Sequence, residues 1–135
     1  MERDKQNARE WHVHKAQPQD LPMIAEIEKL SFHKPWSEEG IESFYYKKTS
    51  DIYVWRDRNR ISGYIMAEHI LEQGELQRIA IVPFIRSMGI GTLFLQEFRE
   101  RYRKMGVETI YLEVRESNNI ARNFYKKNGF EEIGR

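Results

Sequence analysis

The stretch Arg86-Ser87-Met88-Gly89-Ile90-Gly91 decides how this 135-residue chain is interpreted. It follows an apolar, strand-like run at residues 79–82 and precedes a helix-like run at residues 92–105. A helix N-terminus carries about half a positive charge and several unpaired N–H groups, and glycines let an anion approach them closely. The sequence therefore predicts a phosphate or pyrophosphate site, with a simple turn before a helix as the alternative.

Two common nucleotide motifs do not fit this stretch. It lacks the Gly-Lys-Ser/Thr of a P-loop, and it lacks the first glycine of a dinucleotide fingerprint. The sequence therefore favours neither ATP hydrolysis nor a Rossmann domain.

Length, composition and charge fit one compact domain. The chain is 40% hydrophobic and 13% aromatic, which is enough for one core. Its formal net charge is +1 with both signs interspersed, so we expect no direct nucleic-acid partner. The first nine residues lack an apolar leader region, and no run of about 18 apolar residues occurs. We therefore expect a cytoplasmic protein without membrane association.

Cysteine and histidine content argue against a metal centre. The chain has no cysteine, which excludes disulfides, a thiol nucleophile and a Cys-based zinc site. His12 and His14 share one face of a predicted strand, but no third ligand is near them in the sequence. We expect no metal, and we expect residues 1–10 to be a flexible extension before a domain at residues 11–135.

Hydrophobic periodicity predicts a mixed α/β (α+β) sheet with the element order βααβββαβαβ. The expected helices begin at Asp20 and Ser37 and after the glycines, with Leu30 and Met105 among their apolar faces and arginines 99, 101 and 103 on a solvated face. The predicted strands are 11–16, 52–55, 61–70, 75–82, 109–114 and 130–133, and the predicted helices are 20–32, 37–45, 92–105 and 119–128.

Three positions after the glycine turn add to the signal, each with a structural alternative. Glu113 falls within a strand expected to be covered on both faces, where a carboxylate is costly without a task; it is otherwise a solvent-facing residue near a strand end. Tyr125 is either a site residue or a core tyrosine. Asn118 is either a ligand-binding residue or a helix cap.

The same residues form three ordered motifs. They are Val82-Pro83 with Arg86-x-x-Gly89-x-Gly91-x-x-Phe94, then Leu112-Glu113-Val114-Arg115-x-Ser117-Asn118, then Ala121-x-x-Phe124-Tyr125-x-x-Asn128-Gly129-Phe130. Together they resemble the GNAT superfamily of acetyl-CoA-dependent N-acetyltransferases, and within it the RimI group of ribosomal-protein alanine N-acetyltransferases. Pro35-Trp36-Ser37-Glu38 and Gly74-Glu75-Leu76 are also similar to that group, so the resemblance covers about residues 11–135.

The resemblance implies transfer of an acetyl group from acetyl-CoA to a primary amine, with a protein N-terminus as acceptor and a ribosomal protein as a candidate. It implies that Glu113 acts as general base through water and Tyr125 as general acid toward the departing sulfur. Backbone groups would bind the pantetheine arm and the pyrophosphate. The cofactor-binding residues implied are Ile79, Ala80, Ile81, Arg86, Ser87, Met88, Gly89, Ile90, Gly91, Thr92 and Asn118.

The ordinary pKa values of these groups are compatible with the two proton transfers. A thiol has a pKa of about 8.5 and a tyrosine of about 10, so the proton transfer between them is uphill by roughly 2 kcal/mol. An ordinary glutamate is a weak base for an ammonium of pKa about 8, so we expect burial to strengthen Glu113 as a base. An α-amine is about 10% neutral at pH 7 and lysine is under about 0.1%, which favours an α-amine substrate.

The C-terminal region departs from the family pattern. RimI-like chains continue through a tyrosine-containing segment into a seventh strand, whereas this sequence ends at Arg135. We expect either a truncation or a strand supplied by another copy, in a monomer or weak homodimer. Relatives that acetylate peptides hold the acceptor between this region and the first interhelical loop, so Trp36 is a predicted wall of the acceptor cleft, with a core role as the alternative.

Two other functions stay open. One is a GNAT enzyme for a small amine or polyamine, although the sequence shows no obvious acidic cluster for a polycation. The other is a non-catalytic CoA-binding or assembly module, which would bind the cofactor without releasing thiol.

Overall fold

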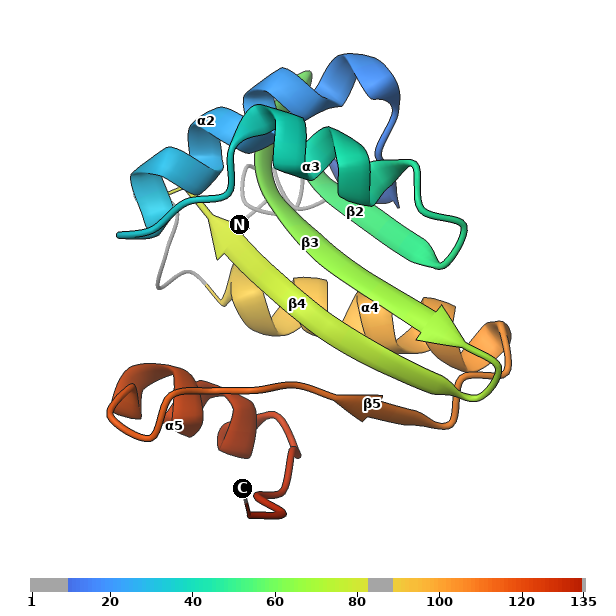
Figure 1. The fold of residues 1–135 in the computed structure, drawn as a ribbon, viewed down its shortest axis with the longest axis vertical. Helices are drawn as coiled ribbons and strands as arrows, with labels where there is room; N and C mark the ends of the chain where they lie inside the picture. The colour runs from blue at the N-terminus through green and yellow to red at the C-terminus, as the bar shows by residue number, and fades with distance from the viewer. Residues whose placement is uncertain (1–9, 83–88, 135) are drawn as a thin grey trace.

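Five strands form one mixed sheet with helices on both faces (Figure 1). The computed structural model describes residues 10–82 and 89–134. The strand order is β1-β2-β3-β4-β5, antiparallel except for the parallel pair β4–β5. The mixed α/β fold predicted from the sequence is confirmed. The elements are β1 (Trp11–Lys15), the 3-10 helix η1 (Pro18–Asp20), α2 (Leu21–Ser31), α3 (Glu38–Tyr45), β2 (Ser50–Asp57), β3 (Arg60–Ile70), β4 (Gln73–Ile81), α4 (Ile90–Lys104), β5 (Thr109–Tyr111) and α5 (Asn119–Lys127).

The core has two layers of side chains, one on each face of the sheet. Helices α2 and α3 cover one face, and α4 covers the other (Figure 1). On the α4 side, Phe98 packs edge-on against Tyr53 and Phe94 packs against Trp55, with ring centroids 6.1 and 5.6 Å apart. Burial of such large aromatic side chains supplies much of the free energy that holds a helix on a sheet.

Local signals fixed the boundaries of several elements. Ser37 caps α3 by accepting a hydrogen bond of 3.0 Å from the Gly40 N–H, as the sequence predicts. The β2–β3 hairpin turns at residues 58–59, also as predicted. The next turn lies at residues 71–72 rather than at Gln73-Gly74, which begin β4 instead.

Two strand predictions near the C-terminus are wrong. β5 ends at Tyr111 rather than Val114, and residues 130–133 form no strand. A strand needs a neighbour for its backbone hydrogen bonds. β5 pairs with β4 over only three residues, and no neighbouring strand pairs with residues 130–133 among the described parts of the chain. Ile133 is accordingly 80% exposed.

Three predictions about helix faces also need correction. Leu30 and Met105 are 67% and 43% exposed, because each lies at the end of its helix, past the part that packs on the sheet. Arg101 is only partly solvated: its side chain is 37% exposed, its Nη2 donates a hydrogen bond of 2.6 Å to the Val13 carbonyl, and its guanidinium lies 5.5 Å from the Tyr53 ring centroid. The aliphatic part of a long cationic side chain can cover apolar surface in this way.

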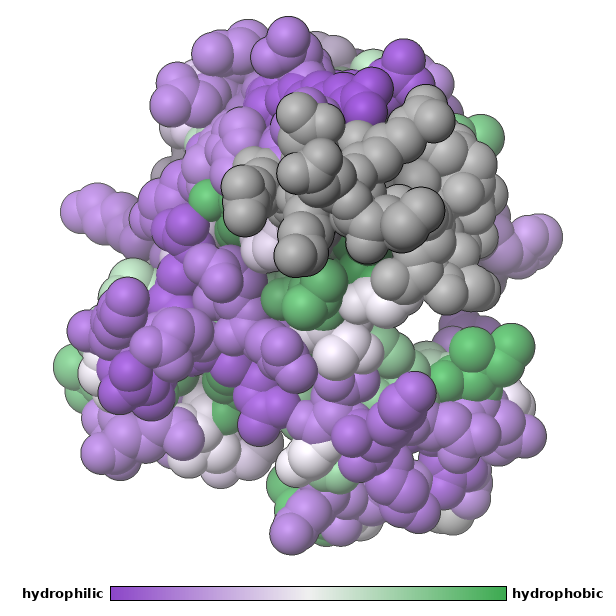
Figure 2. All heavy atoms as spheres, turned by 180° about the vertical axis from the view of Figure 1, so that it is seen from behind, coloured by the Kyte–Doolittle hydropathy of each residue, from purple (hydrophilic) through white to green (hydrophobic). Residues whose placement is uncertain are grey.

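The remaining sequence expectations concern the chain's start and surface. The expected extension at residues 1–10 lies outside the described residues except for Glu10, whose carboxylate accepts a hydrogen bond from Arg58 Nε. Viewed from behind, hydrophilic side chains dominate the surface that is coloured (Figure 2). Within residues 10–82 and 89–134, no helix combines the length and apolar character needed to cross a bilayer.

Candidate active site

The N-terminus of α4 has the geometry of an anion site. Its N-cap residue, Gly89, has a left-handed backbone with φ of 77°, which costs a residue with a Cβ about 1–2 kcal/mol. The first turn carries no acidic side chain. Helix geometry leaves the N–H groups of Ile90, Gly91 and Thr92 without intrahelical acceptors. These predicted residues thus present donors at the positive end of the helix dipole, whereas Arg86, Ser87 and Met88 lie outside the described residues.

Gly91 also allows the close approach of α5. A Cβ at this position would lie 3.3 Å from Cε1 and 3.4 Å from Cζ of Phe124. A side chain at Gly91 would therefore press on the Phe124 ring. This contact brings the residue next to Phe124 in sequence, Tyr125, to the same end of α4 as the glycine turn.

The edge of β4 that faces β5 opens beyond the first three residues of the strand. Gln73, Gly74 and Glu75 pair with residues 109–111 in parallel register, and the chain after Tyr111 leaves the ladder while β4 continues to Ile81. Figure 1 shows the two segments diverging from their paired end. In a ladder, alternate residues turn their backbone groups toward one side. The predicted pantetheine-binding residues Ile79, Ala80 and Ile81 lie on this diverging part.

Glu113 lies two residues past the end of β5. The predicted alternation is confirmed, because Ile110, Leu112 and Val114 are half-buried whereas Tyr111 and Glu113 are exposed. The predicted burial of Glu113 is wrong, since the divergence of β4 and β5 removes the neighbour that would have covered it. Its carboxylate is therefore accessible to water.

Asn118 caps α5. Its Oδ1 accepts a hydrogen bond of 3.1 Å from the Ala121 N–H, so the structural alternative for this residue is present. The Nδ2 group remains as a donor beside the helix start, and a cofactor contact through it stays a prediction.

Tyr125 is half-buried on α5 between two other aromatic rings. Its ring packs edge-on against Phe124 and Phe130, with centroids 5.2 and 5.6 Å away. Burial raises the pKa of Tyr125 to about 12. The phenol therefore keeps its proton throughout the neutral range, so in a proton transfer it can serve there as an acid.

Arg99 of α4 holds the C-terminal end of α5. Its Nη1 donates a hydrogen bond to the Asn128 carbonyl, and its guanidinium lies 5.1 Å from the centroid of the Phe130 ring. A cation at a helix C-terminus satisfies carbonyls that have no intrahelical donor. Arg99 is exposed, as predicted for the solvated face, and it makes this contact from there. Phe124 and Arg99 thus both hold the C-terminal half of α5 against α4.

A buried carboxylate, Glu28, is the functional candidate that the sequence interpretation missed. It is fully buried on α2 and accepts a hydrogen bond of 2.8 Å from the backbone N–H of Trp36, the predicted wall of the acceptor cleft. It also accepts from Arg78 on β4. One signal could have revealed Glu28, which stands four residues after Ile24 on the apolar stripe of α2. Arg78 follows a glutamine and precedes the apolar run at residues 79–82, so the sequence alone does not single it out.

Trp36 itself is half-buried, with its ring edge-on to Phe44 at 5.6 Å between centroids. The ring belongs partly to the core between the loop and α3. Part of the Trp36 ring is exposed, so its role as a wall of the acceptor cleft stays a prediction.

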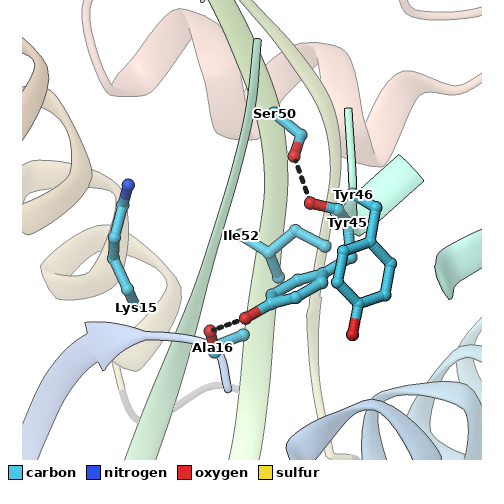
Figure 3. A pocket seen from close by; sticks show the side chains of 6 residues that line it. All are labelled: Lys15, Ala16, Tyr45, Tyr46, Ser50 and Ile52. Carbon is cyan, nitrogen blue, oxygen red and sulfur yellow. Dashed lines mark hydrogen bonds between the residues drawn. The ribbon is translucent and has the colours of Figure 1, made fainter. Parts of the chain in front are cut away.

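Two cavities formed by the described residues lie away from these side chains. One, of about 260 Å³, is lined by Lys15, Ala16, Tyr45, Tyr46, Ser50 and Ile52, and Figure 3 shows Tyr45 donating to the Ala16 carbonyl and Ser50 donating to the Tyr45 carbonyl. A second, of about 380 Å³, lies between Lys15 and the C-terminal half of α4. Neither contains a residue that the sequence assigns to the site. The described residues also contain no group of three or more His, Cys, Asp or Glu side chains arranged for a metal ion.

The predicted residues thus fall into two groups joined by β4 and α4. Gly89, Ile90, Gly91 and Thr92 meet α5, which carries Asn118 and Tyr125, through the Gly91–Phe124 contact. Trp36 is linked through Glu28 to Arg78, the residue before Ile79. The diverging β4–β5 pair thus places an open strand edge before a glycine-started helix whose N–H groups suit an anion.

Comparison with known proteins identifies the class. Residues 21–130 match the model of the Acetyltransferase (GNAT) family. The chain belongs to this family and is an N-acetyltransferase.

Individual relatives are similar over most of the chain. The chain is 32% identical over 114 residues, 84% of its own length and 77% of the relative's, to the [Ribosomal protein bS18]-alanine N-acetyltransferase of Haemophilus influenzae. The crystal structure of the ribosomal-protein-S18-alanine N-acetyltransferase from Escherichia coli superposes with a TM-score of 0.86 at 27% identity, covering 92% of this chain and 79% of that one. Ard1 from Thermoplasma volcanium, at 21% identity and a TM-score of 0.82 over 93% of this chain and 85% of that one, shares the fold.

Proposed function

We propose that this chain transfers the acetyl group of acetyl-CoA to the N-terminal α-amine of a protein. The observation that carries the proposal is the open edge of β4 beyond Glu75, which runs toward the glycine-started helix α4. The acceptor class is supported by relatives named for acetylating the alanine of ribosomal protein bS18. A ribosomal protein is accordingly the first acceptor to test.

The donors present fit such a carrier. Acetyl-CoA supplies the acetyl group as a thioester and carries a pyrophosphate on its nucleotide end. N–H groups of Ile90, Gly91 and Thr92 suit the pyrophosphate, because they sit at a helix start without an acidic neighbour in the first turn. Backbone groups on the diverging part of β4, from Ile79 onward, suit the amide-containing arm by extending the strand's own hydrogen-bonding pattern.

Glu113 is the proposed general base. A carboxylate that is exposed on the segment after β5 can take the ammonium proton through a water molecule. The α-amine needs only modest help, since about 10% of it is already neutral at pH 7. Loss of that proton leaves a nitrogen lone pair free to attack the carbonyl carbon. The nitrogen gives up its second proton to solvent as the amide forms, and solvent returns a proton to Tyr125 after the thiol leaves.

Tyr125 is the proposed general acid, and it gives its proton to the sulfur as the carbon–sulfur bond breaks. With a pKa of about 12 against about 8.5 for a thiol, this transfer is uphill by about 5 kcal/mol, more than the roughly 2 kcal/mol expected for an ordinary tyrosine. A turnover of about 10 per second corresponds to a barrier of about 16 kcal/mol. The step therefore fits within an ordinary enzymatic barrier.

The test combines cofactor binding with a panel of acceptors. Calorimetry with acetyl-CoA should show binding, and CoA release should be fastest with peptides whose free N-terminus resembles that of a ribosomal protein, beginning with Ala- and Met-initiated peptides. Faster release with free small amines or polyamines would overturn the protein-acceptor proposal. Binding without thiol release from any amine would overturn catalysis altogether.

A further inference from the structure

The buried carboxylate of Glu28 joins three separate segments of the chain. Its Oε2 accepts from the Trp36 N–H at 2.8 Å and from Arg78 Nε and Nη2 at 3.1 and 2.8 Å. Its Oε1 accepts from the hydroxyl of Tyr64 on β3. A fully buried carboxylate is tolerated only when it is paired and hydrogen-bonded in this way. The arrangement ties the loop at residues 32–36 to the sheet beneath it.

Arg78 makes two further contacts with the same loop. Its Nη2 donates a hydrogen bond of 3.1 Å to the Lys34 carbonyl, and its guanidinium lies 3.9 Å from the centroid of the Phe32 ring. Arg78 thus contacts residues 32 and 34 of the loop, and Glu28 contacts residue 36. A planar, forked guanidinium can stack on the Phe32 ring and at the same time donate hydrogen bonds to Glu28 and to the Lys34 carbonyl.

The position of Arg78 in β4 connects the loop to the proposed cofactor edge. The β3–β4 register shifts between Met66, which faces Arg78, and Ala67, which faces Leu76, so Gln77 is an extra residue in β4. Such a bulge re-aims the side chains beside it. Arg78 directly precedes Ile79, where the diverging edge proposed for acetyl-CoA continues.

We infer that Arg78, held by Glu28, is a positioning residue that sets the affinity for the acceptor by fixing the loop at residues 32–36 beside β4. This inference rests on the proposed function and on the prediction from the sequence that Trp36, in this loop, is a wall of the acceptor cleft. The acceptor is taken as a peptide, in line with the relatives named for acetylating a ribosomal protein. Arg78 does not take part in proton transfer.

The experiment compares Arg78→Met and Arg78→Lys with the wild-type protein and with Arg103→Met. Arg103 is a matched control, because it also pairs with a glutamate, Glu100, but on the exposed surface of α4. We expect Arg78→Met to raise the KM for the peptide about tenfold, with kcat and the Kd for acetyl-CoA changed less than about twofold. Arg78→Lys should lie between, since lysine keeps the charge and loses the fork. Arg103→Met should leave all three constants unchanged.

A double variant separates positioning from the cost of a buried charge. Arg78→Met alone leaves Glu28 without its cation, which lowers stability. In Glu28→Gln with Arg78→Met, the amide oxygen can still accept from Trp36 and the charge is gone, so thermal stability should recover while the peptide KM stays raised. Recovery of the KM in the double variant would overturn the inference.

Hydrogen exchange provides a readout that does not need activity. The amides of residues 32–34 and 36 should exchange faster in Arg78→Met than in the wild type or in Arg103→Met. Unchanged exchange, or a wild-type peptide KM in a folded Arg78→Met protein, would overturn the role of Arg78. Absence of acetyl transfer by the wild type would instead overturn the proposed function, and the exchange result would still decide whether Arg78 fixes the loop.

Discussion

The Phe124 ring of α5 packs so closely on Gly91 that a Cβ at that position would lie 3.3 Å from its Cε1 atom, a few tenths of an ångström too near. The helix that would bind the pyrophosphate and the helix that carries the proposed acid are therefore in direct contact. A larger side chain at residue 91 would therefore shift Phe124, and with it α5. The glycine turn thus serves the packing of α5 as well as the approach of an anion.

Gly91→Ala should separate stability from activity. Alanine gains about 1 kcal/mol of helix propensity over glycine, and Phe124 can yield by a few tenths of an ångström because α5 has no fully buried residue. We expect an unfolding free energy equal to or above that of the wild type, with kcat lowered several-fold as Tyr125 moves. Urea unfolding and CoA-release kinetics measure the two effects. Wild-type kcat would contradict the coupling of the two helices.

Arg99→Met should release the C-terminal end of α5. The hydrogen bond from Arg99 to the Asn128 carbonyl is exposed, so we expect a loss of unfolding free energy below about 1 kcal/mol. Exchange of the amides at residues 125–130 should nevertheless rise and kcat should fall. Arg103→Met, on the same helix, should do neither, and equal effects in both variants would refute a specific role for Arg99.

Tyr125→Phe should remove the proposed acid with little change in packing. We expect kcat to fall about 100-fold, within the usual range for a general acid, and the Kd for acetyl-CoA to change less than about twofold. Because burial raises the pKa of Tyr125 to about 12, loss of its proton should not lower the wild-type rate below about pH 11. A fall in rate near pH 10 that disappears in Tyr125→Phe would show that the phenol ionises normally.

Glu113→Gln should lower kcat by about 100-fold at neutral pH and leave acetyl-CoA binding intact. The carboxylate is exposed, so the isosteric amide should not alter the unfolding free energy. A rate that falls in acid in the wild type and not in the glutamine variant would assign the titrating base to this residue. Full activity in Glu113→Gln would remove it from the mechanism.

Alkaline pH should destabilise the fold through its buried tyrosines. Burial, followed by the charge of Asp51, raises the pKa of Tyr53 to about 12, and burial raises that of Tyr125 equally. Burial also raises the pKa of Tyr64 and Tyr102, helped by hydrogen bonds to Glu28 and Asp51. Unfolded tyrosines ionise near pH 10, so this stability is complete below pH 10 and is lost as the pH rises toward 12, by about 1.4 kcal/mol per pH unit and tyrosine.

Urea unfolding at pH 9 and pH 11 would measure that loss. Tyr125→Phe should reduce the pH dependence by the contribution of one tyrosine, whereas Tyr46→Phe, at a residue that is 65% exposed, should not change it. An identical pH dependence in all three proteins would contradict the contribution of Tyr125.

Local sequence signals determined the elements and the class of this protein. The Ser37 cap, the turn at residues 58–59 and the glycines before α4 act within a few residues, and each element formed where they predicted. The three ordered motifs identified the family, because backbone donors at a helix start depend on glycine and spacing rather than on distant contacts.

Long-range contacts decided the rest. The divergence of β4 and β5 ended β5 early and exposed Glu113. Residues 130–133 form no strand, because none of the described strands pairs with them. The Glu28–Arg78 pair joins residues 50 positions apart, and the Arg99–Asn128 bond joins residues 29 apart. Periodicity reports which side of an element is apolar, but the partner that a buried charge meets is set by the packing of whole elements, which only the tertiary structure defines.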